Sequence, residues 1–167
     1  MKRCVTFAGA PGCSKTPIAN YLSTSLSLAV LNNDAIRAEV AEDLNGFRVN
    51  EYNGRQEKRL RQTLKSGISF IYDASVDRKW PTFKDWLSEY DYSYFIISLD
   101  LSEKLLTTLY KSKCYVNTDK LKSYIKDHDG FLSKYNKDIG MHINDKGFSN
   151  RLNISYNSVF NWMENIN

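Results

Sequence analysis

The chain has 167 residues, which is about the size of one domain. Its 23 basic and 19 acidic side chains give a net charge of +4, and 13% of its residues are aromatic, so the composition excludes a disordered or collagen-like chain. Three cysteines without a C-x-x-C pair argue against a disulfide scaffold or a zinc ribbon and are typical of a reducing compartment.

Strands and helices alternate along the sequence. Short apolar runs predict strands over residues 3–8, 28–32, 68–73, 93–99 and 150–155. Apolar spacings of three and four, bounded by capping and turn residues, predict helices over 15–26, 34–43, 51–66, about 80–90, 102–110, 119–135 and 157–166. Because most of these strands are continuously apolar, we expect an α/β fold with a mostly parallel five-stranded sheet covered on both faces.

The sequence predicts neither an export signal nor a membrane span. Two basic residues and a short apolar run begin the chain, but the run leads directly into Pro11, Gly12 and Lys15. The apolar stretch at 94–99 is of strand length, well below the roughly 20 residues that cross a bilayer. We therefore expect a cytoplasmic protein with no membrane partner.

The segment between the first strand and the first helix has the composition of a phosphate-binding loop. Its residues are Gly9, Ala10, Pro11, Gly12, Cys13, Ser14, Lys15 and Thr16. In such a loop backbone N–H groups converge on phosphate oxygens, the lysine reaches the β and γ phosphates, and the threonine hydroxyl binds Mg²⁺. Ser14 departs from the strict pattern, which has glycine there. The alternative is a tight turn with a surface lysine.

Asp34 and Arg37 follow the second predicted strand. Ligands of parallel sheets bind beyond the carboxyl ends of the strands, so both side chains are expected at the same edge as the loop. There Asp34 is a candidate base for an attacking hydroxyl, and Arg37 a candidate contact to an anionic group. In the alternative interpretation Asp34 only caps the helix and Arg37 is its surface neighbour.

Asp73 comes at the end of the third predicted strand, where related folds place a carboxylate near the metal's water shell. Asp100, at the end of the next strand, is a weaker candidate for the same role. His128 and His142 have no metal-ligand spacing around them, so we expect surface or local hydrogen-bonding roles for them.

The mild overall charge is concentrated in one segment. Residues 48–65 hold six basic and two acidic side chains, a net charge of +4, and Arg55 and Arg59 lie near the middle of this predicted helix. A solvated amphipathic helix is the ordinary explanation, and contact with an anionic acceptor is the sharper one. No modular nucleic-acid signature accompanies the segment, and no Asn-Lys-x-Asp element favours guanine, so ATP is the expected nucleotide.

The motifs GAPGCSKT, NDAIR and FIYDAS, in this order, resemble those of the small P-loop kinases grouped with polynucleotide 5′-kinase, zeta toxin and chloramphenicol phosphotransferase. The resemblance implies one three-layer P-loop NTPase domain over residues 1–167, similar to the nucleoside monophosphate kinases. It also implies that Lys15 and Thr16 hold ATP and Mg²⁺, that Asp34 is the general base and that Arg37 positions the acceptor.

The same resemblance implies that Asp73 and Ser75 lie near the metal or the acceptor, and that a lid at about 110–118 closes over the phosphates. Such lids carry arginines, but this chain has none from Lys79 through Asn150, and Lys111 and Lys113 are the nearest cations. The implied activity is transfer of the γ-phosphate of ATP to a hydroxyl, first that of a polynucleotide or nucleoside 5′ end. A small-molecule kinase or a regulatory ATPase without efficient transfer are the alternatives.

Overall fold

The computed structural model describes residues 1–114 and 118–165. Its strands are β1 (Lys2–Ala8), β2 (Ala29–Asn32), β3 (Phe70–Ser75), β4 (Tyr92–Leu99) and β5 (Ile139–Ile143). Its helices are α1 (Lys15–Leu26), α2 (Asn33–Asp43), α3 (Val49–Ser66), α4 (Trp80–Glu89), α5 (Glu103–Ser112), α6 (Thr118–Tyr135) and α7 (Arg151–Asn165), with 3-10 helices at Asn136–Asp138 and Phe148–Asn150. None of the described helices is both long and apolar enough to cross a membrane.

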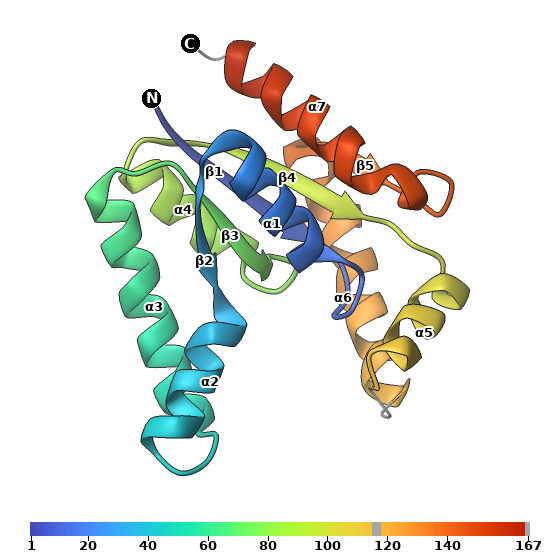
Figure 1. Cartoon of the computed structure of the whole chain (residues 1–167), viewed down its shortest axis with the longest axis horizontal. Helices are drawn as coiled ribbons and strands as arrows, with labels where there is room; N and C mark the ends of the chain where they lie inside the picture. The colour runs from blue at the N-terminus through green and yellow to red at the C-terminus, as the bar shows by residue number, and fades with distance from the viewer. Residues whose placement is uncertain (115–117, 166–167) are drawn as a thin grey trace.

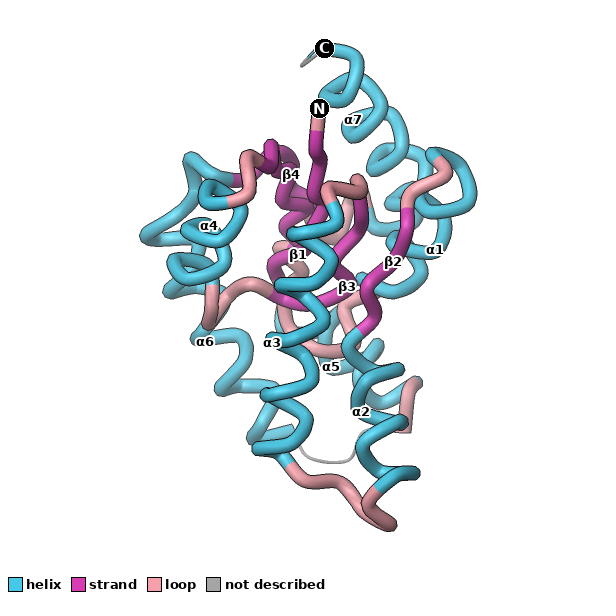
Figure 2. Tube along the Cα trace, turned by 90° about the vertical axis from the view of Figure 1, so that its left-hand side faces the viewer, coloured by secondary structure: helices cyan, strands magenta, loops and turns pink. Residues whose placement is uncertain are grey.

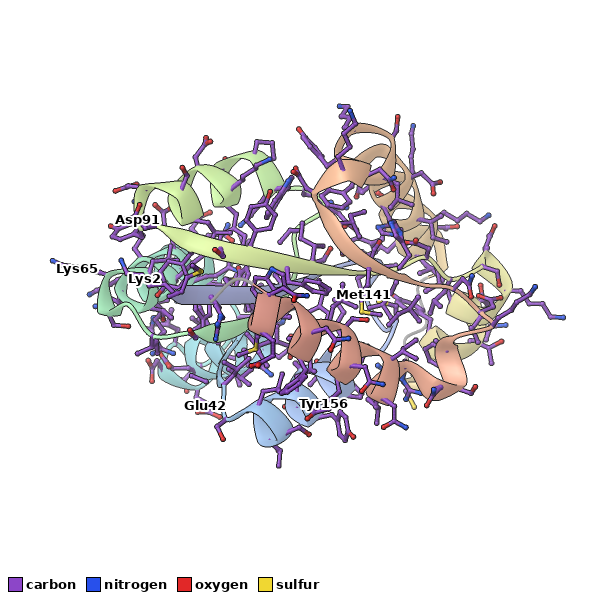
Figure 3. All side chains as sticks on the ribbon, turned by 90° about the horizontal axis from the view of Figure 1, so that it is seen from above. Lys2, Glu42, Lys65, Asp91, Met141 and Tyr156 are labelled. Carbon is purple, nitrogen blue, oxygen red and sulfur yellow. The ribbon has the colours of Figure 1, made fainter. Side chains whose placement is uncertain are left out.

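All five strands are parallel, in the order β2-β3-β1-β4-β5 (Figure 1). Figure 2 shows the strands in the middle of the molecule, with α4 on one side and α1 and α7 on the other. The view from above in Figure 3 shows the same three layers, with α6 beside α4. The three-layer α/β fold predicted from the sequence is therefore confirmed.

Alternate residues of the central strands enter two separate hydrophobic cores. Val5, Phe7 and Ile97 are fully buried in the core that faces α1 and α7. Cys4 and Ile96 are fully buried in the second core, which faces α3, α4 and the end of α6. Because side chains of a strand alternate between the two faces of a sheet, a continuously apolar strand buries both faces.

The prediction of a last strand over residues 150–155 is wrong, because this segment begins α7. Leu152, Ile154 and Tyr156 alternate as they would in a strand, but the pattern continues with the spacing of a helix. Leu152, Tyr156, Val159 and Met163 are four, three and four residues apart and all pack in the core on the α1 side. The longer helical pattern outweighs the short alternating one.

The strand that replaces it, β5, is an edge strand with a weak sequence signal. Its residues read Ile-Gly-Met-His-Ile, only the last is fully buried, and Gly140 lowers its strand propensity. The glycine has a packing reason. A Cβ placed there would lie 2.5 to 2.7 Å from three ring carbons of Phe95.

We predict that Gly140→Ala lowers the free energy of unfolding by about 1–3 kcal/mol, because the ring of Phe95 must move in a packed site. Urea denaturation measures the change. Gly130→Ala is the matched control: a Cβ at this exposed position of α6 contacts nothing within 4 Å, so alanine should stabilise the helix by about 0.5–1 kcal/mol. Equal stability of Gly140→Ala and the wild type would contradict the close packing of Phe95.

Candidate active site

The turn from β1 into α1 is built from residues with positive backbone φ angles. The φ angles are 133° at Gly9, 83° at Gly12 and 84° at Ser14. A Cβ at Gly9 would lie 3.0 Å from Sγ of Cys13 and 3.2 Å from the backbone oxygen of Leu99, so this position admits only glycine. The turn ends at the N-terminus of α1, where backbone N–H groups and the helix dipole favour an anion.

The ammonium group of Lys15 lies over the inside of this loop. Its Nζ donates to the backbone oxygens of Gly9 at 3.0 Å and Ala10 at 2.8 Å, and it lies 3.5 Å from Sγ of Cys13. Lys15 therefore holds the loop closed and at the same time places a positive charge within it.

Thr16 and Asp73 meet at the edge of the sheet beside the loop. The hydroxyl of Thr16 lies near the Asp73 carboxylate, which accepts a 3.1 Å bond from Nδ2 of Asn32. Asp73 is only 8% exposed. Burial raises the pKa of Asp73, while the nearby Thr16 hydroxyl and the charge of Lys15 oppose the rise. A hydroxyl and a carboxylate are oxygen donors of the kind that Mg²⁺ prefers.

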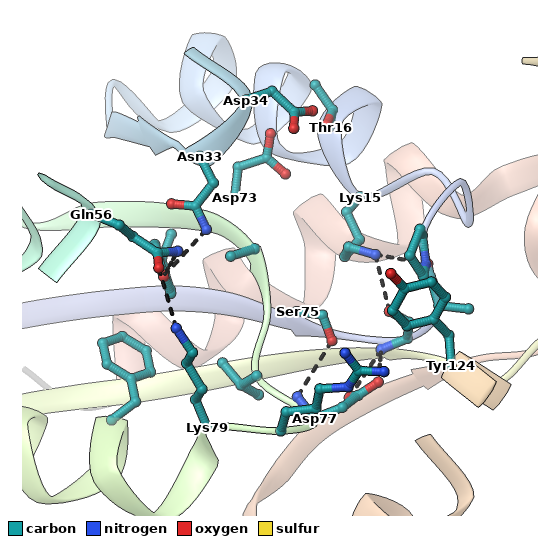
Figure 4. Close-up of a pocket in the computed structure, with 18 of the residues that line it drawn as sticks. Lys15, Thr16, Asn33, Asp34, Gln56, Asp73, Ser75, Asp77, Lys79 and Tyr124 are labelled. Atoms are coloured by element: carbon teal, nitrogen blue, oxygen red, sulfur yellow. Dashed lines mark hydrogen bonds between the residues drawn. The ribbon is translucent and has the colours of Figure 1, made fainter. Parts of the chain in front are cut away.

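Asp34 lies beside this pair and does not cap its helix. The cap of α2 is Asn32, whose Oδ1 accepts the backbone N–H groups of Asp34 at 2.7 Å and Ala35 at 3.2 Å. The interpretation of Asp34 as a simple helix cap is therefore wrong. Figure 4 shows its carboxylate next to Thr16 and Asp73, and the charge of Asp34 helps to raise the pKa of Asp73.

A cavity of about 760 Å³ begins at the loop and extends between β3 and the helices α3 and α4. Asp34 and Asp73 line it between the loop and its far end. The far end is lined by a mixture of aromatic, amide and small side chains from three elements: Tyr52, Asn53, Gln56, Tyr72, Thr82, Phe83 and Trp86. The cavity thus joins a cationic end to an end lined mainly by aromatic and amide groups, with Glu57 and Lys79 beside them.

A chain of hydrogen bonds fixes the polar groups of the aromatic and amide-lined end (Figure 4). The hydroxyl of Tyr72 accepts from Nε2 of Gln56 at 2.9 Å and from Nδ2 of Asn33 at 3.3 Å. Nζ of Lys79 donates to Oε1 of Gln56 at 3.3 Å. Burial raises the pKa of Tyr72 to about 12, so its hydroxyl stays protonated. These groups offer directed hydrogen bonds, and Lys79 adds one positive charge.

Most of the residues predicted for the site lie along this cavity. All of the predicted loop residues except the buried Cys13 line it, as do Asp34, Asp73, Ser75 and Lys113. Arg37 and Lys111 are not among the described residues that line it. The guanidinium of Arg37 lies 4.0 Å from the centre of the Phe47 ring, and Lys111 is exposed at the end of α5. The predicted lid at 110–118 falls partly on residues 115–117, which lie outside the described residues.

Arg55 and Arg59 lie outside the cavity and are engaged by acidic side chains. Arg55 pairs with Glu39 at 2.8 Å, Glu51 at 3.0 Å and Asp43 at 2.5 Å. Arg59 pairs with Glu39 at 2.5 Å. The net positive charge of the segment 48–65 is thus partly neutralised by α2. Binding of an acceptor by these two arginines stays a prediction.

Sequence reasoning missed a partly buried chain of alternating acids and histidines behind the loop. His128 is 7% exposed and lies between Asp77, 3.3 Å from Nδ1, and Asp100, 3.0 Å from Nε2. Asp100 also contacts Nδ1 of His142 at 2.5 Å. Both carboxylate oxygens of Asp77 lie 3.2 Å from the backbone nitrogen of Gly9, so this chain ends on the phosphate loop.

The hydrogen bonds in this chain decide its charge. Burial lowers the pKa of His128, but its bonds to Asp100 and Asp77 outweigh burial and raise it to about 9. Burial raises the pKa of Asp100, but bonds from His128, Ser98 and His142 outweigh it and lower the pKa to about 2. The four residues come from separate elements, so no spacing in the sequence reveals them. Of these four residues, only Asp100 has a signal in the sequence, because it comes at the end of a predicted strand.

No protein-family model and no curated protein matches the chain. Among solved structures, a sugar kinase from a Janibacter species is 18% identical, with a TM-score of 0.66 over 98% of this chain and 95% of that one. A gluconokinase from Sinorhizobium meliloti is 11% identical, with a TM-score of 0.66 over 98% and 94%. A deoxyadenosine kinase from M. mycoides, solved with dCMP and dCDP, is 14% identical, with a TM-score of 0.59 over 98% and 100%.

The chain has the fold of the P-loop kinases. The likeness covers nearly the whole length of each protein, so it includes α5, β5 and α7 as well as the loop. At these identities it shows the fold alone, and the chemistry has to be argued from the side chains in the cavity.

We predict that the free energy of unfolding falls by about 2–3 kcal/mol as the pH rises from 6.5 to 9, since one pKa unit corresponds to about 1.4 kcal/mol. The cause is His128, whose pKa rises from 6.5 when unfolded to about 9 in the folded chain. Between these values the folded state holds a proton that the unfolded state has lost. Urea titrations at several pH values measure the trend, and His128→Gln should remove most of it. An equal decline in His128→Gln would contradict this assignment.

Proposed function

We propose that the protein transfers the γ-phosphate of ATP to a hydroxyl group, and that the 5′-hydroxyl of a nucleoside or of a polynucleotide end is the first candidate acceptor. The observation that carries the proposal is the single cavity that joins a phosphate loop to an aromatic and amide-lined end, with Asp34 and Asp73 between the two. Phosphoryl transfer needs this order of parts, because the attacking oxygen, the phosphorus and the leaving oxygen must lie in line and the base must reach the attacking hydroxyl.

The loop is suited to the phosphates of the donor. Its backbone N–H groups and the N-terminus of α1 supply directed partial charges, and Lys15 supplies a full one. Nζ of Lys15 now bonds to two loop carbonyl oxygens, so binding exchanges these for phosphate oxygens without moving the lysine out of the loop. Lys113, which also lines the cavity, supports the donor from the side of α5.

Thr16 and Asp73 fit the needs of a magnesium ion. Both present oxygen donors at the edge of the loop, and Mg²⁺ is commonly held by one or two such groups together with phosphates and water. When bound, the ion neutralises charge on the phosphates. A cation there would also stabilise the ionised form of Asp73, whose pKa burial raises.

Asp34 is suited to take the proton of the acceptor hydroxyl. Asn32 satisfies the N-terminus of α2, so the Asp34 carboxylate is available to the cavity, between the loop and the acceptor end. A carboxylate in this position orients the hydroxyl and accepts its proton as the bond to phosphorus forms. Arg37, one turn further along α2, stacks on Phe47 and does not line the cavity. Its contact with the acceptor stays a prediction.

The aromatic and amide-lined end of the cavity favours an acceptor with a ring and several hydrogen-bonding groups. Phe83 and Trp86 supply apolar faces, and Tyr72 and Gln56 supply directed polar groups. A nucleoside meets this description, and so does a sugar-like small molecule. The solved deoxyadenosine kinase, sugar kinase and gluconokinase carry names that refer to acceptors of this size.

We predict that Asp34→Asn lowers kcat by about 10²–10⁴-fold and leaves the affinity for ATP nearly unchanged, because it removes the proton acceptor and spares the loop. Turnover of ATP with a panel of nucleosides, 5′-hydroxyl oligonucleotides and sugars gives kcat, and calorimetry gives the affinity. Asp129→Asn, at an exposed position of α6, is the matched control.

Two results would count against this mechanism. If no acceptor raises ATP turnover and Asp34→Asn does not change it, the protein is a nucleotide-binding ATPase rather than a kinase. Lys15→Ala should weaken ATP binding about 10–100-fold through the lost charged hydrogen bonds, relative to the exposed control Lys134→Ala. Unchanged affinity in Lys15→Ala would overturn the phosphate loop itself.

We predict that reversing Arg55 and Arg59 to Glu raises the KM for a 5′-hydroxyl oligonucleotide about tenfold and leaves the KM for a free nucleoside unchanged. The two arginines lie outside the cavity, so only an acceptor whose phosphates extend along α3 reaches them. Steady-state kinetics with both acceptors measures the difference. Unchanged values for both acceptors would make the segment ordinary surface.

A further inference from the structure

Ser14 stands at a backbone position that serine rarely occupies. Its φ and ψ angles are 84° and 22°, in the left-handed region, and the residue is 5% exposed. For a residue with a Cβ this conformation is disfavoured, and glycine is the usual occupant. A contact from outside the loop can offset this conformational cost.

The group that contacts Ser14 comes from the other end of the chain. Nε of Arg151 donates to Oγ of Ser14 at 2.7 Å, across 137 residues. The guanidinium is itself fixed, because Nη1 donates to the backbone oxygen of Phe148 at 3.1 Å and the group lies 4.4 Å from the centre of the Phe148 ring. Arg151 thus reaches the loop as a rigid donor.

The position of Arg151 is unfavourable for α7 taken alone. It is the first residue of the helix, where the dipole disfavours a positive charge. The helix that carries it packs along α1, where Tyr21 donates to Oδ1 of Asn153 at 3.2 Å. The packing of α7 on α1 therefore brings Arg151 to the start of α1, and the bond to Ser14 gives its charge a partner.

The direction of the Ser14 hydroxyl matters for the loop. Ser14 is the N-cap of α1, and a serine there ordinarily accepts the N–H of the second or third helical residue. Ser14 makes no such side-chain bond in this structure. The hydroxyl is held toward α7, so it leaves the backbone N–H of Thr16 for an anion in the loop.

We propose that Arg151 is a positioning residue for the phosphate loop: it holds the hydroxyl of Ser14 so that serine occupies the left-handed position that glycine takes in the strict motif. The contribution of Arg151 to nucleotide binding rests on the proposed function. Its stabilisation of Ser14 through the hydrogen bond does not. Arg151 acts through Ser14 and contacts the loop from behind the cavity.

A double-mutant cycle tests this proposal. The variants are Arg151→Met, Ser14→Gly and the two combined. Methionine keeps an apolar stem over Phe148. Arg48→Met, at an exposed arginine, is the control. Calorimetry with Mg²⁺-ATP and with inorganic tripolyphosphate gives the affinities. We expect Arg151→Met to weaken both ligands about tenfold when residue 14 is serine and less than about twofold when it is glycine. Arg151→Lys should behave like Arg151→Met, because its ammonium cannot reproduce the Nε donor.

Several results would overturn the proposal. Equal losses with serine and glycine at position 14 would show that Arg151 does not act through Ser14. Loss of affinity for Mg²⁺-ATP but not for tripolyphosphate would show that Arg151 contacts the adenine of the nucleotide rather than positioning the loop. Wild-type affinity in Arg151→Lys would show that charge alone suffices.

Failure of the proposed function looks different. The wild type would then bind neither ligand, and the unfolding equilibrium of the same four proteins decides the proposal. Arg151→Met should raise the unfolding constant about tenfold with serine at position 14 and less than about twofold with glycine. Additive effects of the two substitutions on unfolding would overturn the hold on Ser14.

Discussion

The left-handed backbone between β1 and α1 is the constraint on which the site depends. Gly9 passes too close to Leu99 to carry a side chain, and the backbone again has positive φ angles at Gly12 and Ser14. Such a turn aims its N–H groups inward and leaves its outer groups to be satisfied by neighbours. The carboxylate of Asp77 lies against the N–H of Gly9, Lys15 bonds to the loop carbonyl oxygens, and Arg151 holds Ser14. The loop is therefore shaped by contacts from both ends of the chain.

The parallel sheet assembles the rest of the site at the same edge. β2 and β3 are in register, with Asn32 opposite Asp73, so the amide that caps α2 also reaches the carboxylate beside Thr16. One side chain thereby sets the position of both acids, because Asn32 fixes the start of α2 and so the place of Asp34. A substitution at Asn32 therefore acts on two candidate functional groups, Asp34 and Asp73. The Asn32 amide itself faces neither the phosphate donor nor the acceptor hydroxyl.

The sequence predicts those parts of the molecule that follow from local pattern. The loop, four of the five strands and the placement of Asp34 and Asp73 at one edge are each encoded within a few neighbouring residues and the rule for parallel sheets. The prediction of the fifth strand is wrong because Gly140 is there to accommodate Phe95. This is a contact between two strands that no local pattern contains. His128 and Asp77 are missed for the same reason, since their partners come from distant elements.

The arginines are a second case in which contacts between distant elements decide the role of a residue. Within the sequence the segment 48–65 is a cationic patch, but its charge is met by Glu39 and Asp43 of α2, which lie outside the segment. Arg151 stands alone late in the sequence, and it is this arginine that contacts the loop.

The cations that do line the cavity are placed unevenly, and this bears on the acceptor. Lys15 and Lys113 lie toward the phosphate loop, and Arg78 is paired with Asp127 and lies over Tyr124, which Figure 4 shows beside Lys15. At the other end, Lys79 donates to the neutral amide of Gln56, which does not cancel its charge. A neutral hydroxyl-bearing ring needs only the aromatic faces and amide groups already in place there. A phosphate attached to that ring would meet Lys79. The charge distribution of the cavity therefore suits a nucleoside and the 5′ end of a polynucleotide alike.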